Sequence, residues 1–484
     1  MRPTVRFLTD ELRDRIIDEA RELLTGLGME IHSDRALALL GDHGARIQER
    51  HAFFTADLID RALASAPASI DLFDAHGKRT HDLGGHRVHF TPASSAIHFL
   101  DPDSGRARTP TTADYVRYAK VVAGLPHIAA QSTAFIPADV PTGVQDAHRL
   151  YLGLMHCAKP VITGAFSVRG LRLMRDLLET VRGSREALAE KPLAVFSCAP
   201  TTPLLWSDIT VENLLDCAEA GIPIEIPTMP LAGFTSPITI VGTLALHTAE
   251  TMSGVILAQL AAPGARVLYG GSPAPFDIRY ETTPMGAAET WLMDAGLNEI
   301  GKRLGLPTQA YIALSDAKAL DAQAGLETGM GAVVAALSGI NSVSGPGMLD
   351  FENCHSVEKL VVDHEICGLA QRLARGIEPR EDFPVRERIE ELLREKHLLI
   401  SEHSLQHMAA EHYYPDPVLE RASQARWLDE GAGTVLDRAR DRADRLAAAW
   451  QPPGLPDATT DALRRRMTEA VVAAGADGLP AEAP

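Results

Sequence analysis

The chain has few cysteines and no uninterrupted apolar run of membrane-spanning length. Its five cysteines, Cys157, Cys198, Cys217, Cys354 and Cys367, are odd in number and include no Cys-x-x-Cys pair, which argues against a disulfide framework and a thiolate zinc site. No stretch of about 18 apolar residues occurs, and the N-terminus lacks the apolar core of a signal peptide. We therefore expect a soluble, cytoplasmic protein with reduced thiols and no membrane partner.

Positive charge is also scarce. The 484 residues include 46 Lys and Arg against 64 Asp and Glu, which gives a net charge of −18, and no basic block occurs. Such a surface repels the phosphates of nucleic acids. The sequence therefore predicts no nucleic-acid partner.

Several catalytic signatures are missing as well. The chain has no Gly-x-Ser-x-Gly elbow, no phosphate-binding P-loop and no Gly-x-Gly-x-x-Gly after a strand. His403 and His407 have the spacing of a zinc-protease motif, but Ser404 replaces its glutamate. We expect no bound metal; the alternative is a zinc site without a recognised spacing, formed by Cys354, His355, His364 and Cys367.

What the sequence does contain is a repeated alternation of short apolar runs and helix-length amphipathic stretches. Continuous apolar runs are typical of parallel strands buried on both faces. Seven runs are clear, and an eighth strand comes from either 397–401 or 88–99. The pattern favours an α/β fold of TIM-like (β/α)8-barrel type over an open sheet. The seven runs are 127–133, 159–166, 192–200, 222–230, 265–273, 308–316 and 339–349.

The barrel is expected to occupy only part of the chain. Helical periodicity from Thr9 to about Leu40, followed by short alternating runs, predicts an N-terminal helical and small β elaboration over 1–105. The barrel and C-terminal helices then span 106–450, and 451–484 is expected to be a partly disordered tail.

Aromatic and acidic residues follow many of the predicted strands, where a barrel places its active site. Aromatic rings and carboxylates together suit a cationic ligand. The alternatives are core packing for the rings and helix capping for Asp316 and Asp321. The candidate substrate-binding residues are Phe166, Glu225, Tyr269, Phe276, Asp277, Asp316, Asp321, Gln323 and Glu352.

Four segments in the same order resemble the trimethylamine methyltransferase family: 236–260, 269–279, 307–325 and 344–353. The resemblance extends over nearly the whole chain. It implies a TIM-like barrel that passes a methyl group from an amine to the Co(I) centre of a separate corrinoid protein. No tightly bound cofactor is then expected, since cobalamin arrives on the partner; the nearest string to a cobalamin-binding motif, DAHRLY, has Tyr151 where glycine is required.

The segment SGPGMLD distinguishes the chain from family members that use trimethylamine. Those members carry pyrrolysine just before a GMLE-like segment, whereas Pro346, an ordinary residue, lies at or next to that position here. The chain resembles the non-pyrrolysine branch, whose members include glycine betaine methyltransferases. The implied donor is a small quaternary amine, and a sulfonium meets the same chemical requirement.

His355 is the candidate catalytic residue near the methyl group or the corrinoid, and its alternative is a structural histidine at a helix start. The candidate hydrogen-bond donors for the carboxylate of a betaine are Arg279, Lys318, Gln323 and His355. Two further functional hypotheses stay open: another methyl acceptor such as a folate, and a barrel that only binds quaternary amines. A homo-oligomer is compatible with the long terminal elaborations.

Overall fold

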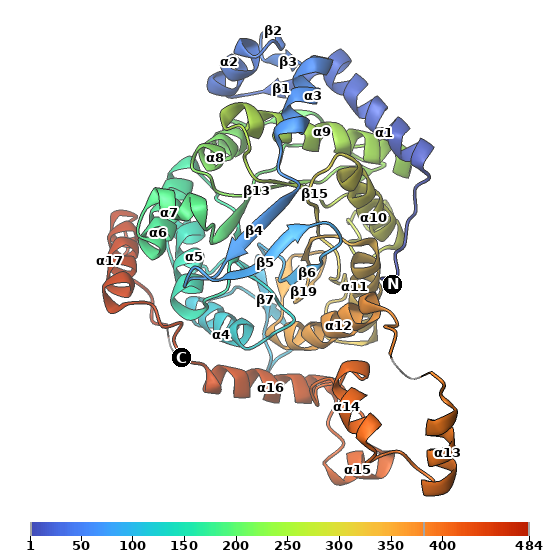
Figure 1. The fold of residues 1–484 in the computed structure, drawn as a ribbon. Coiled ribbons are helices and arrows are strands. Elements are labelled where there is room, and N and C mark those ends of the chain that lie inside the picture. Colours follow the sequence, from blue (N-terminus) through green and yellow to red (C-terminus); the bar gives the residue numbers. More distant parts are fainter. Residues whose placement is uncertain (1, 381–382, 483–484) are drawn as a thin grey trace.

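The computed structural model describes residues 2–380 and 383–482. Two sheets of parallel strands, β9–β10–β11–β13–β15 and β17–β18–β6, form the centre of the molecule. Parallel bridges from Tyr269 to Thr308 and from Phe90 to Ile128 join the sheets at both edges, so the eight strands follow one another in a ring (Figure 1). The strands are β6 (His89–Thr91), β9 (Gln131–Ser132), β10 (Val161–Thr163), β11 (Ala194–Ser197), β13 (Ile224–Thr228), β15 (Val267–Gly271), β17 (Gln309–Ala310) and β18 (Ser342–Ser344).

The eighth strand is β6, one of the two segments that the sequence left open. It pairs with β18 from Ser342 to Ser344, whereas residues 397–401 form a turn. Because β6 precedes residue 105, the boundary expected there is wrong: the barrel begins inside the segment assigned to the elaboration. The strand has only three residues, too few for its periodicity to stand out.

A helix follows each strand and packs outside the ring, as in a (β/α)8 barrel. Ser, Thr or Asp side chains cap most of these helices, which explains where they start. One of them, α9, is long and apolar enough to span a membrane but is mostly buried as a core helix. The helices are α4 (Thr112–Ala123), α5 (Gln145–His156), α6 (Val168–Arg182), α8 (Asp208–Glu219), α9 (Ile240–Ala261), α10 (Ala288–Arg303), α11 (Ala322–Ser338) and α12 (Val357–Arg375).

A hairpin of β4 (Ser69–Phe73) and β5 (Arg79–Gly84) lies across one end of the ring (Figure 1). Its apolar side chains pack against residues near the start of four strands; the cluster consists of Ile70, Leu72, Leu83, Ala130, Ile162, Val195 and Leu268. The hairpin therefore closes the N-terminal end of the barrel. Because side chains alternate along a strand, the positions two residues after Val195 and Leu268 are also on the inner face; these are Ser197 and Gly270.

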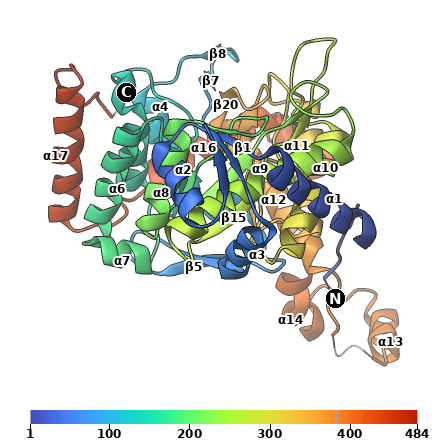
Figure 2. The same cartoon turned by 90° about the horizontal axis from the view of Figure 1, so that it is seen from above.

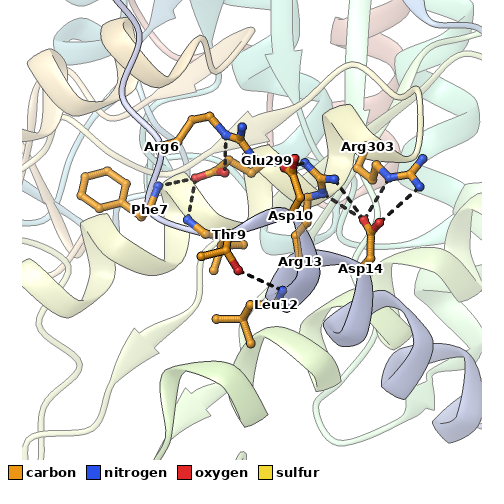
Figure 3. A network of polar contacts seen from close by, with 10 residues as sticks. Arg6, Phe7, Thr9, Asp10, Leu12, Arg13, Asp14, Glu299 and Arg303 are labelled. Atoms are coloured by element: carbon orange, nitrogen blue, oxygen red, sulfur yellow. Dashed lines mark hydrogen bonds and ion pairs between the residues drawn. The ribbon is translucent and has the colours of Figure 1, made fainter.

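The N-terminal elements pack on the outer face of the barrel, mainly against α9 and α10 (Figures 1 and 2). Glu299 of α10 accepts hydrogen bonds from the backbone amides of Phe7 at 2.6 Å and Leu8 at 3.2 Å, and Arg303 pairs with Asp14 (Figure 3). The elements are α1 (Asp10–Glu22), η1 (Leu23–Leu27), β1 (Met29–Ile31), α2 (Asp34–Asp42), β2 (Arg46–Gln48), β3 (His51–Phe53) and α3 (Ala56–Ser65).

The C-terminal part forms two groups of helices. α13 (Arg386–Glu395), α14 (Glu402–Glu411) and α15 (Gln424–Asp429) project from the body, and α16 (Val435–Ala449) packs against α4 and α12 (Figure 1). The expected disordered tail instead contains α17 (Asp457–Ala473), which packs on α5 and α6. Its composition is polar, but three apolar residues at helical spacing, Leu463, Met467 and Val471, are buried.

The remaining short elements lie in the connections. They are β7 (His98–Leu100), β8 (Ala107–Arg108), η2 (Thr142–Val144), α7 (Arg185–Glu190), β12 (Leu205–Trp206), β14 (Leu231–Ala232), β16 (Ala274–Pro275), β19 (Met348–Leu349) and β20 (Cys354–His355).

A buried ion pair on α12 supports the loop that follows β18. Lys359 donates to Asp363 at 2.5 Å and to Thr328 at 2.8 Å, and Asp363 also accepts the backbone amide of Gly347 at 2.7 Å. We predict that Lys359→Met lowers the free energy of unfolding by about 3–5 kcal/mol, because Asp363 then stays buried without its counter-charge.

Urea denaturation measures this effect. The control Lys78→Met, at an exposed lysine, is expected to change stability by less than about 0.5 kcal/mol. Equal effects of the two substitutions would contradict the role assigned to the ion pair.

Candidate active site at the barrel mouth

Glu225 is a buried carboxyl on the inner face of β13. Its neighbour across the sheet, Ser197 of β11, donates a hydrogen bond to Glu225 Oε1 at 2.5 Å. The other oxygen, Oε2, has no hydrogen-bond partner among the described residues, and the side chain is fully buried. Burial raises the pKa of Glu225 to about 7.

Glu352 brings a second carboxyl to the same place. It belongs to the turn between β19 and β20, in which Asp350, Phe351 and Glu352 all have positive φ, at 52°, 55° and 67°. Three consecutive non-glycine residues in the left-handed region are strained, and such strain persists where the surroundings enforce it, often at functional sites. Burial and the charge of Glu225 raise the pKa of Glu352 well above its usual range, so the two carboxyls are neighbours.

Tyr311 completes this group, and Gln309 lies two residues before it on the same face of the strand; the sequence interpretation missed both. Tyr311 follows β17; burial and the charges of Glu225 and Glu352 raise its pKa, while hydrogen bonds with serine side chains oppose that shift. Gln309 accepts the amide of Gly271 at 3.2 Å, and its Nε2 has no partner among the described residues. Tyr311 could have been selected from the sequence, because it is an aromatic residue in the predicted run 308–316 and aromatic residues at strand ends were taken as candidates.

We call Glu225, Glu352 and Tyr311 the acidic cluster. One buried carboxyl oxygen of each glutamate has no hydrogen-bond partner among the described residues. A buried carboxyl without a counter-charge stays protonated, or it ionises when a cation binds beside it. An organic ammonium ion supplies that charge, and a phenol ring attracts its methyl groups. Within residues 2–380 and 383–482 no three His, Cys, Asp or Glu side chains gather for a metal ion.

Two predicted aromatic residues lie on loops at the same end of the barrel. Phe166, after β10, is half-exposed, and the guanidinium of Arg149 stacks on its ring at 4.5 Å. Phe276, after β15, stacks on Phe234 from the loop after β13, with ring centroids 4.7 Å apart. Both therefore border the C-terminal end of the barrel.

Tyr269 faces away from the cluster. Its hydroxyl donates to Thr248 of α9 at 2.9 Å, and its ring is fully buried between β15 and the helices. Leu268 on one side packs with the barrel interior. Because successive side chains of a strand point to opposite faces, Tyr269 packs against the outer helices, which corrects its assignment as a substrate-binding residue.

Asp321 caps a helix, as the sequence left open, whereas Asp316 does not cap a helix and binds a loop instead. Asp316 accepts the backbone amides of Met285 and Gly286, both at 2.9 Å, and burial raises its pKa to about 6. Asp321 caps α11 by accepting the amide of Ala324 at 3.1 Å. Both carboxyls are thus committed to loop and helix ends.

Asp277 and Gln323 are engaged on the surface. Asp277 pairs with the exposed Arg279 at 2.6 Å, and this pairing lowers the pKa of Asp277. Gln323 is exposed and donates to Glu327 at 2.9 Å. The structure does not bring either side chain into the acidic cluster.

His355 lies in a fully buried aromatic group. Its ring makes an edge contact with Tyr118, with centroids 5.1 Å apart, and lies 5.4 Å from the ring of Phe135. Burial lowers the pKa of His355 to about 3, so the imidazole is neutral at physiological pH. This arrangement is that of the alternative, a packed structural histidine.

A comparison with protein families decides the classification. Residues 1–470 match the family model described as trimethylamine methyltransferase (MTTB). The chain belongs to this family. It is therefore a methyltransferase, and the resemblance found in its four sequence segments is confirmed.

Individual relatives extend over nearly the same length. The glycine betaine methyltransferase of Desulfitobacterium hafniense (strain Y51) is 28% identical over 94% of this chain and 94% of its own. The trimethylamine methyltransferase MttB of Methanosarcina barkeri (strain Fusaro / DSM 804) is 30% identical over 78% of this chain and 77% of its own. The crystal structure of the Methanosarcina barkeri monomethylamine methyltransferase (MtmB) is similar in fold, with a TM-score of 0.52, 12% identity, and coverage of 92% and 89%.

We predict that Glu225→Gln stabilises this methyltransferase more at high pH than at low pH. The ordinary pKa of the carboxyl is 4.5, and that in the folded protein is about 7. Between these values the folded state holds the extra proton, so the wild type loses stability as pH rises, whereas glutamine does not titrate. The difference in unfolding free energy is expected to grow by about 1–3 kcal/mol from pH 5 to pH 8.

Urea denaturation at the two pH values measures this difference. Glu11→Gln, at an exposed glutamate, is the matched control and is expected to show no such growth. A constant difference for Glu225→Gln would show that the carboxyl does not titrate in this range.

Proposed function

We propose that this methyltransferase takes a methyl group from a small quaternary amine, such as glycine betaine, and passes it to the Co(I) centre of a corrinoid protein. The observation that carries the proposal is the acidic cluster of Glu225, Glu352 and Tyr311, with buried carboxyl oxygens that lack partners among the described residues. The similarity to a glycine betaine methyltransferase supports the same substrate class.

The chemistry needs orientation and charge more than acid–base catalysis. The N–CH3 bond breaks with its electron pair going to nitrogen, which leaves as a neutral tertiary amine, while Co(I) supplies the pair for the new bond to carbon. No proton has to move. The residues of the chain would hold the ammonium head beside Glu225 and Glu352 and keep bulk water away from it.

The rim of the barrel mouth suits a protein partner. Apolar side chains on the loops after β10, β13 and β15 are exposed, and the stacked pair of Phe234 and Phe276 joins two of these loops. Exposed apolar groups of this kind are typical of protein interaction sites. They are Phe166, Phe234, Ile238, Ile278 and Tyr280. Cobalamin would arrive on that partner, with no cofactor held tightly by this chain.

Incubation of the enzyme with glycine betaine and free cob(I)alamin tests the proposal. We predict methylcobalamin and an equal amount of dimethylglycine, and we predict that Glu352→Gln lowers the affinity for glycine betaine by about tenfold, because glutamine, unlike the carboxyl, cannot lose a proton and become charged beside the ammonium. Absorbance follows the corrinoid, and calorimetry measures the affinity.

Other outcomes favour the other hypotheses. Binding without methyl transfer to cobalamin would leave a different acceptor, such as a folate, or a barrel that only binds the ligand. Activity with a sulfonium alone would change the donor class, and absence of binding would contradict the proposal.

A further inference from the structure

The buried arginine on α5 has hydrogen-bond donors to spare. Arg149 is fully buried, yet none of its hydrogen bonds within residues 2–380 and 383–482 goes to an Asp or Glu. Nη1 donates to Ser95 Oγ at 2.9 Å and to the carbonyl of Thr133 at 2.9 Å, and Nη2 donates to the carbonyl of Gly164 at 3.2 Å. Nε has no partner among the described residues.

These contacts leave two N–H groups of the guanidinium without a partner among the described residues. A guanidinium carries five N–H donors, and the three bonds above use three of them. The two that remain are on Nε and Nη2, which are adjacent atoms. An edge of two adjacent donors is the arrangement that binds a carboxylate with two parallel hydrogen bonds.

The cost of burying this cation argues for an anionic ligand. Burial lowers the pKa of Arg149 to about 10, so the group stays charged at neutral pH without a full counter-charge. The nearest carboxylate on its own helix, Asp146, accepts the amide of Phe166 at 2.9 Å instead. An unpaired buried charge is costly unless a partner joins it.

Arg149 lies at the same end of the barrel as the acidic cluster, close in the ring to Glu352 and further round it from Glu225. Its acceptors follow β6, β9 and β10, whereas Glu225 is on β13 and Glu352 follows β18. Tyr311 links the two groups, since its phenol interacts electrostatically with Arg149 and with both carboxyls. The C-terminal end of the barrel thus carries a buried cation as well as buried acidic groups.

We propose that Arg149 binds the carboxylate of a zwitterionic substrate whose ammonium head lies against Glu225 and Glu352. This inference rests on the proposed function and narrows it to betaines, that is, quaternary amines that also carry a carboxylate. A cation without a carboxylate, such as choline, leaves the free edge of Arg149 unsatisfied and binds less well.

The four donors predicted from the sequence are poorly placed for this role. Arg279 pairs with Asp277, Lys318 pairs with Asp350 at 3.2 Å, and Gln323 bonds to Glu327. His355 is neutral and enclosed by aromatic rings. The sequence interpretation did not select Arg149, because this residue lies in the middle of a helix and the local sequence does not indicate that its side chain reaches three loops.

Calorimetric titration of the full-length enzyme with glycine betaine and with choline tests the assignment. We expect Arg149→Met to weaken glycine betaine binding by about tenfold to a hundredfold and choline binding by less than about threefold, because only the first ligand carries a carboxylate. Arg149→Lys should give an intermediate loss for glycine betaine, since it keeps the charge but offers no adjacent donors.

The matched control is Arg182→Met. Arg182 also donates to several backbone carbonyls, but near the hairpin that closes the opposite end of the barrel. It should leave both affinities unchanged. An equal loss of both ligands in Arg149→Met would assign a purely structural role to Arg149 and overturn the proposal.

A comparison of ligands on the wild type avoids any folding defect of the variants. The methyl ester of glycine betaine keeps the ammonium and neutralises the carboxylate, so it should bind at least about tenfold more weakly than glycine betaine. Equal affinities for glycine betaine and its methyl ester would overturn the role of Arg149 and leave the proposed function unaffected. If the wild type binds none of these ligands, the proposed function fails together with this inference.

Discussion

Two interacting carboxyl groups lie at the C-terminal end of the barrel, Glu225 fully buried and Glu352 half-buried with one buried oxygen, and no ion pair with either is formed among the described residues. Glu225 is placed there by a strand of the ring, and Glu352 by a strained turn beyond the last strand. Burial raises the pKa of both groups, and the charge of Glu225 raises that of Glu352 further. A folded protein keeps such an arrangement at a cost in stability, which a permanently charged ligand can offset.

The rest of the fold makes this arrangement possible. The hairpin of β4 and β5 fills the opposite end with apolar side chains, which leaves the polar interior positions near the ends of the strands. The ion pair of Lys359 and Asp363 holds the amide of Gly347, and with it the loop that leads to Glu352. Arg149 ties together the loops after three other strands. Charges of both signs are thereby fixed on a rigid frame around one end of the barrel.

Much of the fold follows from local sequence, because parallel strands buried on both faces leave continuous apolar runs. All seven predicted runs contain a barrel strand. The short β6 and the packed helix α17 were harder to predict, since β6 has three residues and α17 buries only a narrow stripe of a polar sequence. The sequence predicted the acidic character of the site but not every residue in it. Glu225 and Glu352 were among the candidates. Tyr269 was also a candidate, but it is one position along the strand from the inward-facing Leu268 and therefore lies on the outer face. Arg149 depends on tertiary contacts that no local pattern encodes.

A crystal structure of the enzyme with glycine betaine tests the central claim most directly. The account predicts that the trimethylammonium group lies against the carboxyls of Glu225 and Glu352, inside the C-terminal end of the barrel. It would be contradicted by a ligand bound elsewhere, for example in the surface cavity of about 560 Å³ lined by Arg380, Arg388 and His407, with the two carboxyls left as they are in the free protein.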